Sequence, residues 1–161
     1  MKSLTEIKNE VSRLAERIGA PAKIWPTYGK SEDFARPHIE VDSRGYHYVV
    51  VERGEEFQRI TTQDLDELLC KIFQNITFSL ACDYELAHRV ENQDCRRSVF
   101  RHQIELLSKI SLAWAERESE RQEEVLRQHP FDDNSDARVR LSKQVGWKMA
   151  CERFPLLTQK G

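Results

Sequence analysis

The sequence predicts an α+β fold: an N-terminal helix, then a small three-stranded antiparallel meander, then a mainly helical bundle. Two changes of hydrophobic period carry this prediction. Apolar residues recur every three or four positions near the N-terminus and again from Leu65 onwards, which is typical of amphipathic helices. Between these regions, from His38, apolar and polar residues alternate with the period of two that strands show, and Tyr46–Val51 is apolar or aromatic on both faces, as in a central strand.

The N-terminal helix is predicted from one apolar stripe. Ser3 is a candidate N-cap, and Glu6 is its capping-box partner. Gly19 and Pro21 should end the helix, because glycine favours the left-handed C-terminal position and proline prevents resumption. The stripe consists of Leu4, Ile7, Val11, Leu14 and Ile18.

The meander should follow an irregular connection over residues 22–36, with one short strand at Lys23–Trp25. In the first strand Ile39 and Val41 should face one way, and His38, Glu40 and Asp42 the other. We expect a hairpin loop at Ser43–Gly45, a central strand at Tyr46–Val51, a turn at Arg53–Gly54 and a third strand at Glu56–Ile60.

The helical bundle should centre on one long helix, which the capping-box pattern Thr61–Asp64 opens and which runs to Val90. Phe78, Cys82 and Leu86 lie off its main apolar stripe, so we expect its second half to be covered on two sides.

Further helices should follow along the chain. Asn92 or Asp94 should cap the next helix, and Ser111 should begin another that runs to Gln128. We divide the chain into a domain over residues 1–134 and a basic C-terminal extension over residues 135–161. That extension should form one short helix, at about residues 137–152, packed on the same domain.

Charge is unevenly distributed along the chain. Residues 61–134 carry a balance of −6, and residues 135–161 carry +4. An acidic middle argues against direct nucleic-acid binding and suits a basic protein partner. The basic tail could touch nucleic acid or a membrane, but packing against the acidic middle is the more economical interpretation.

The compartment is predicted to be the cytoplasm. The longest apolar stretches are too short to span a membrane, and the N-terminus has no signal-peptide pattern. The four cysteines show no C-x-x-C spacing, so we expect free buried thiols.

The familiar catalytic and cofactor motifs are missing, so we predict a protein without enzymatic activity, cofactor or metal. The alternative is a small metal-dependent enzyme. The pattern Glu85-x-x-His88 is half of a bundle di-metal motif, and His102 and Glu105 offer the reversed spacing on the next helix. A complete site needs two further carboxylates, and the sequence offers none at the right spacing.

Charged residues also crowd the junction between the long helix and the next one. We interpret them as a structural polar network and not as an acid–arginine active site, because arginine binds carboxylates bidentately. The network residues are Glu85, Arg89, Asp94, Arg96 and Arg97. On the sheet, His38, Glu40 and His47 could do acid–base work, but we expect no activated nucleophile beside them and favour a binding surface.

Several segments, taken in order, resemble the immunity protein 63 family of bacterial polymorphic toxin systems. The similarity runs from about Leu14 to Asp133, and one departure is Cys70-Lys71, where an aromatic pair is expected. The segments are Pro37–Val41, Gly45–Glu55, Thr61 or Thr62, Leu68-Leu69, Thr77-Phe78, Tyr84–Leu86, His88-Arg89, Asp94, Arg96-Arg97 and His129–Asp133.

The resemblance implies an immunity protein that neutralises a cognate toxin by stoichiometric binding and occlusion of the toxin's active site. If the toxin is a basic nuclease, acidic residues would mimic phosphate. The candidate toxin-binding residues are Asp42, Tyr48, Glu52, Glu55, Glu56, Asp132 and Asp133. A non-catalytic scaffold subunit without a toxin partner is the remaining alternative.

Overall fold

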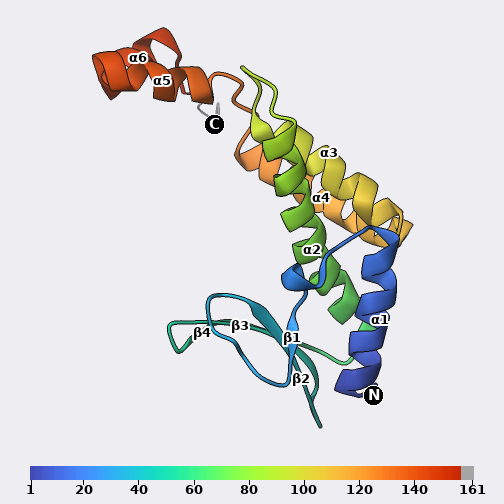
Figure 1. Cartoon of the computed structure of the whole chain (residues 1–161). Coiled ribbons are helices and arrows are strands. Elements are labelled where there is room, and N and C mark those ends of the chain that lie inside the picture. Colours follow the sequence, from blue (N-terminus) through green and yellow to red (C-terminus); the bar gives the residue numbers. More distant parts are fainter. Residues whose placement is uncertain (157–161) are drawn as a thin grey trace.

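The computed structural model describes residues 1–156 and has an α+β architecture (Figure 1). A four-stranded sheet lies at one end, α1 and the long helix α2 pack beside it, and α3 and α4 extend the helical part away from it. No helix of the described residues is long and apolar enough to cross a membrane. The α+β class is therefore confirmed, whereas the sheet differs from the prediction.

Helix α1 (Leu4–Arg17) forms as its sequence pattern predicts. Ser3 Oγ accepts a hydrogen bond from the Glu6 N–H at 3.3 Å, and the Glu6 carboxylate accepts one from the Ser3 N–H at 2.8 Å. The bond from the Ser3 N–H, together with bonds from the Ser3 hydroxyl and the Lys2 ammonium group to the same carboxylate, lowers the pKa of Glu6 to about 2. Ile7 and Val11 are fully buried, so the apolar stripe faces the core.

The connection after α1 contains the first correction. Residues 23–25 were predicted to be a strand, but η1 (Ala22–Ile24) is a 3-10 turn and the strand β1 is Thr27–Tyr28. β1 pairs in parallel with β2, with Thr27 opposite His38, so the sheet is mixed and has four strands. Parallel pairing depends on the path of the intervening chain, and no local pattern reveals it.

The other three strands form the predicted antiparallel meander: β2 (Pro37–Asp42), β3 (Gly45–Glu52) and β4 (Glu55–Thr62). β4 is longer than the predicted strand, and Gly45 belongs to β3 instead of the loop. A Cβ at Gly45 would lie 2.4 Å from the Thr62 carbonyl oxygen, which explains glycine there. Arg53 and Gly54 form the second turn with φ of 54° and 78°.

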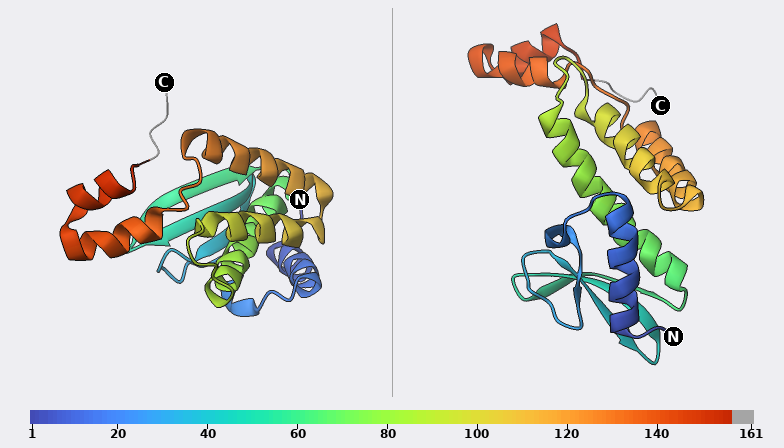
Figure 2. Two further views of the ribbon diagram at one scale, coloured as in Figure 1. Left: turned by 90° about the horizontal axis from the view of Figure 1, so that it is seen from above. Right: turned by 45° about the vertical axis from the view of Figure 1, so that its right-hand side comes forward.

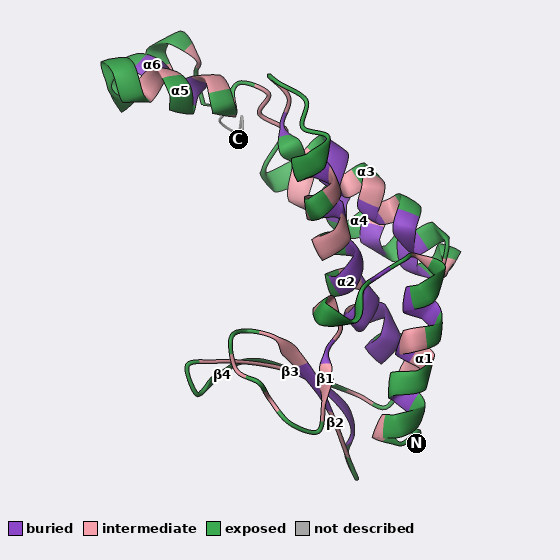
Figure 3. Ribbon diagram, in the orientation of Figure 1, coloured by how far each residue is buried: buried purple, intermediate pink, exposed green. Residues whose placement is uncertain are grey.

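Helix α2 (Leu65–Ala87) is the longest of the described helices, with 23 residues. Asp64 is its N-cap, so the predicted capping box beginning at Thr61 is wrong: Thr61 and Thr62 still belong to β4. Phe73 and Ile76 are fully buried in the hydrophobic cluster to which α1 and the sheet also contribute (Figure 3).

The second half of α2 is less covered than predicted. Helices α3 (Cys95–Ser108) and α4 (Leu112–Gln128) begin at the N-caps Asp94 and Ser111, as expected, and pack with α2. However, 43% of Phe78 and 66% of Leu86 remain exposed, so the prediction of coverage on two sides is wrong. Helix α3 packs on only one side of α2, and the off-stripe residues lie outside that contact.

The C-terminal region forms two helices instead of the single one predicted at about 137–152. These are α5 (Ser135–Val145) and α6 (Trp147–Arg153), which pack on each other beyond the end of α2 to α4 (Figures 1 and 2). Gly146, with φ of 83°, separates them. The division into a domain and an extension stays a prediction, and residues 157–161 of that extension lie outside the described residues.

The cysteines form no disulfide within the described chain. Cys70 is buried, and burial raises the pKa of its thiol. Cys95 is exposed, so the prediction that all four thiols are buried is wrong.

Candidate protein-binding surface

One face of the sheet packs against helices; we call the opposite face, which no helix covers, the open face, although His38, Val49 and His47 on it are only 3%, 0% and 1% exposed. α1 and α2 lie on the same side of the sheet in both views of Figure 2. The strand register puts two cross-strand rows on the other face, which no helix covers. One row is His38, Val49 and Arg59, and the next is Glu40, His47 and Thr61.

Arginines neutralise much of the acidic charge on this open face. Arg59 binds Glu40 at 2.7 Å and Glu56 at 2.7 Å, and it lowers the pKa of both carboxyls. At the other end of β2, Arg44 binds Asp42 at 2.8 Å and holds the pKa of that carboxyl well below its usual range. The face is thus a paired polar surface and not a field of free carboxylates.

An unexpected relay of an acid, a histidine and a hydroxyl crosses the three strands. His47 Nε2 lies 2.8 Å from Asp42 Oδ1, and His47 Nδ1 lies 2.8 Å from Thr61 Oγ1. The order of groups is that of a hydrolase triad. The short distance to Asp42 does not amount to a hydrogen bond, because the atoms are not aligned for one. His47 is only 1% exposed, so we interpret the relay as a link between strands.

The predicted toxin-binding residues do not form one surface. Glu52, Glu55 and Glu56 lie at the β3–β4 turn. Asp132 and Asp133 lie in the α4–α5 connection, at the far end of the helices from the sheet (Figure 1).

Tyr48 lies in the core instead of on the surface. It is 3% exposed, and Lys71 Nζ lies 5.5 Å from its ring centroid. It faces the core because its register position matches Ile39, whereas the pattern of β3, apolar on both faces, left its direction open. We therefore remove Tyr48 from the candidate binding residues.

The helix junction around Asp94 is a connected set of ion pairs. Arg96 Nη2 binds Asp94 Oδ2 at 2.6 Å and also donates to the Pro130 carbonyl oxygen at 2.8 Å. Arg97 Nε binds Asp133 Oδ1 at 2.9 Å, and that oxygen accepts from the Asp94 N–H at 2.9 Å. These bonds tie the start of α3 to the α4–α5 connection.

The four side chains of the alternative metal site, Glu85, His88, His102 and Glu105, are not placed together to hold a metal ion. The ring of Tyr84 stacks between His88 and His102, with centroid distances of 4.2 and 4.0 Å. Glu85 is buried and binds Arg89 at 3.0 Å. Glu105 Oε2 lies 3.2 Å from His102. Across the described residues, no group of three or more His, Cys, Asp or Glu is placed to hold a metal ion.

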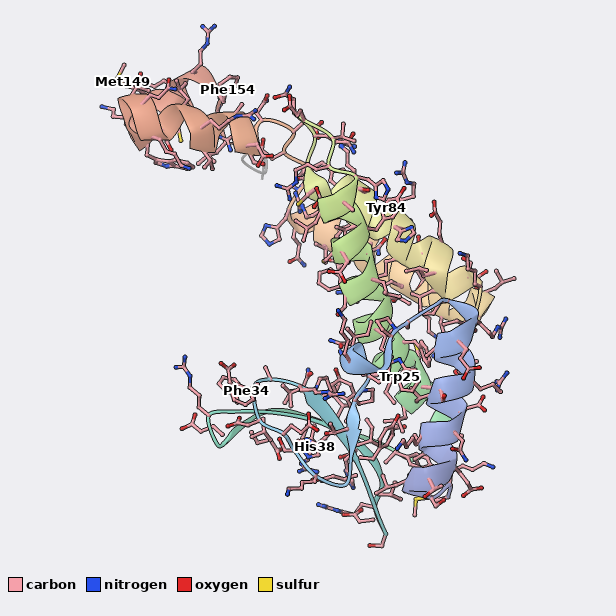
Figure 4. The ribbon with its side chains drawn as sticks, viewed as in Figure 1. Trp25, Phe34, His38, Tyr84, Met149 and Phe154 are labelled. Atoms are coloured by element: carbon pink, nitrogen blue, oxygen red, sulfur yellow. The ribbon has the colours of Figure 1, made fainter. Side chains whose placement is uncertain are left out.

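The sheet end that carries the β3–β4 turn holds a feature that the sequence analysis missed. Phe34 is 91% exposed there (Figure 4). A hollow of about 330 Å³ lies beside it, lined by Phe34 with Asp33, Glu52 and Arg53. The only sign of this feature in the sequence was an aromatic residue, Phe34, inside a polar irregular segment.

Comparison with known proteins gives one match. The family model described as Immunity protein 63 matches residues 42–124, just over half of the 161 residues. No curated protein and no solved structure matches the chain. The matched segment runs from the end of β2 into α4, so it is narrower than the resemblance noted from Leu14 to Asp133.

Proposed function

We propose, from the premise that this chain belongs to the immunity protein 63 family, that it neutralises a cognate bacterial toxin by stoichiometric binding that covers the toxin's active site. The family match is the observation that carries the proposal. It covers β3, β4, α2 and α3, which hold most of the core.

The geometry of the sheet supports a binding role. β4 is an edge strand, and seven of its eight residues are exposed, so one row of backbone N–H and C=O groups is open to a partner. The sheet face that no helix covers carries paired charges at fixed positions, although His38, Val49 and His47 on it are buried. Fixed charges favour specificity and fast association over raw affinity.

We place the toxin-binding surface at the β3–β4 end of the sheet and assign Glu52, Glu55 and Glu56 to it. Asp42 lies at the opposite end of β2 and could contribute only to a partner that spans the open face. Asp132 and Asp133 belong in this proposal to the structural junction, because they lie at the far end of the helices from the sheet, where Arg97 binds Asp133 and Arg138 binds Asp132. A basic toxin, such as a nuclease, fits the three glutamates.

The proposed action is binding without turnover, in the cytoplasm of the cell that makes the toxin. Under this proposal a secreted protein with a C-terminal toxin domain is encoded beside this gene, and the test uses that domain. Titrating that domain with the purified protein should abolish toxin activity with a break at one molecule per toxin. Co-purification should give a 1:1 complex of matching mass.

Two outcomes would contradict this function. Inactivation of many toxin molecules by each molecule of this protein would indicate catalysis. Normal growth of cells that make the neighbouring toxin domain without this protein would remove the need for an immunity role.

A further inference from the structure

We propose that Phe34 is the anchor by which this protein binds its partner, and that the partner offers an apolar pocket rimmed by lysine or arginine. This inference rests on the proposed function and deepens it by naming one side chain and the chemistry of the surface opposite. Phe34 precedes the segment that the family model matches, so family membership assigns it no role.

The backbone holds this ring outward against its own preference. Asp33, Phe34 and Ala35 have φ of 63°, 56° and 57°, so three consecutive residues with side chains occupy the left-handed region. Each is disfavoured there, because the Cβ atom crowds the carbonyl oxygen. Such strain is commonly kept where function needs it.

The segment is fixed at both ends, so the ring has a defined position. The Asp33 N–H donates to Ser31 Oγ at 3.0 Å. The Ala35 N–H donates to the Val51 carbonyl oxygen at 3.0 Å, which ties the segment to β3. An exposed aromatic side chain in a fixed position can bind with little loss of entropy.

The surroundings of the ring are suited to a protein partner. The hollow beside Phe34 can receive a side chain from the partner while the ring enters the partner's pocket. Aromatic residues are enriched in protein interfaces, and a few buried anchors carry most of the binding energy. At 91% exposure, Phe34 is more exposed than any other large apolar residue of the described chain.

The charge around the ring indicates a basic partner. Residues 32–36 and 52–56 together carry five carboxylates and two guanidinium groups. This excess of negative charge would attract a lysine or arginine at the rim of the partner's pocket, which is why we commit to a basic partner.

The experiment measures binding of an inactive form of the neighbouring toxin domain to four proteins: wild type, Phe34→Ala, Phe34→Gly and Phe78→Ala. Phe34→Ala and Phe34→Gly should weaken the Kd by at least about 30-fold. Phe78→Ala removes a partly exposed ring on α2 and should leave the Kd within about 3-fold. Phe34→Gly should unfold at the same or a higher temperature than wild type, because glycine adopts positive φ without strain.

Several results would overturn the anchor. Equal binding of Phe34→Ala and wild type would refute it while leaving the proposed function intact. A wild-type protein that fails to bind the domain would refute the proposed function, and the anchor with it. Self-association of the wild type that Phe34→Ala abolishes would assign the ring to a second copy of this chain instead.

Discussion

Replacing Asp94 with asparagine is the sharpest test of the helix junction. Asp94 is 6% exposed and accepts hydrogen bonds from three groups of neighbouring residues. They are the Arg96 N–H at 3.0 Å, the Arg96 guanidinium at 2.6 Å and the Asp132 N–H at 2.8 Å. Asparagine has the same shape but no charge, and its NH₂ group cannot accept.

The expected loss follows from these contacts. Asparagine caps a helix as well as aspartate does, so the bond to the Arg96 N–H is kept. Weakening the charge-assisted bond from the guanidinium costs up to the full contribution of such a bond, about 1.5–3 kcal/mol. Leaving the Asp132 N–H without an acceptor costs about 1–3 kcal/mol. The Arg96 side chain is 28% exposed, so water compensates part of the loss. We expect the free energy of unfolding to fall by about 2–4 kcal/mol.

The assay is urea unfolding of wild type, Asp94→Asn and the matched control Asp83→Asn. Asp83 is exposed on α2 and its side chain makes no hydrogen bond or ion pair with residues 1–156, so its replacement should change stability by less than about 0.5 kcal/mol. A loss at Asp94→Asn no larger than at Asp83→Asn would refute the reasoning, because the junction would then contribute nothing measurable.

Three further predictions concern stability. Burial raises the pKa of Asp94, but hydrogen bonds from Arg96 and Asp132 outweigh it and lower the pKa overall. The stabilisation that ionised Asp94 provides is therefore complete above pH ~4 and is lost as pH falls through the lower pKa of the folded state. The free energies of unfolding of the wild type and Asp94→Asn should therefore converge below pH ~4. Gly45→Ala should cost about 3 kcal/mol or more in thermal unfolding, because the new Cβ meets the Thr62 carbonyl. Thr61→Val should cost about 1–2 kcal/mol in urea unfolding by removing the partner of His47, without changing the stoichiometry of toxin neutralisation.

Controls separate these effects from general damage. Gly54→Ala also places a side chain at positive φ, but no atom lies within 4 Å of the new Cβ, so it should cost only about 1–2 kcal/mol. Thr5→Val changes an exposed threonine of α1 and should be nearly neutral. Equal losses at Gly45→Ala and Gly54→Ala would contradict the steric argument. Loss of toxin neutralisation by a Thr61→Val protein of normal stability would instead indicate a catalytic role for the relay of Asp42, His47 and Thr61.

The sequence alone determined the features whose energetics are local. The N-caps Ser3 and Ser111 were identified correctly and Asp94 was one of two candidates with Asn92, because a cap bonds within its own first turn. The antiparallel meander was also predicted, since the alternation of side chains and the short turns lie close together in the chain. Membership of the family followed from the order of short segments along the chain.

Only the tertiary structure decided which groups meet. It gave β1 a parallel partner, buried Tyr48 and left Phe78 exposed. It also paired His47 with Thr61, and it separated the glutamates of the β3–β4 turn from the aspartates of the α4–α5 connection. It also turned Phe34 outward through three left-handed residues. These outcomes depend on contacts between distant segments, whose free energy exceeds the weak local preferences that a sequence pattern records.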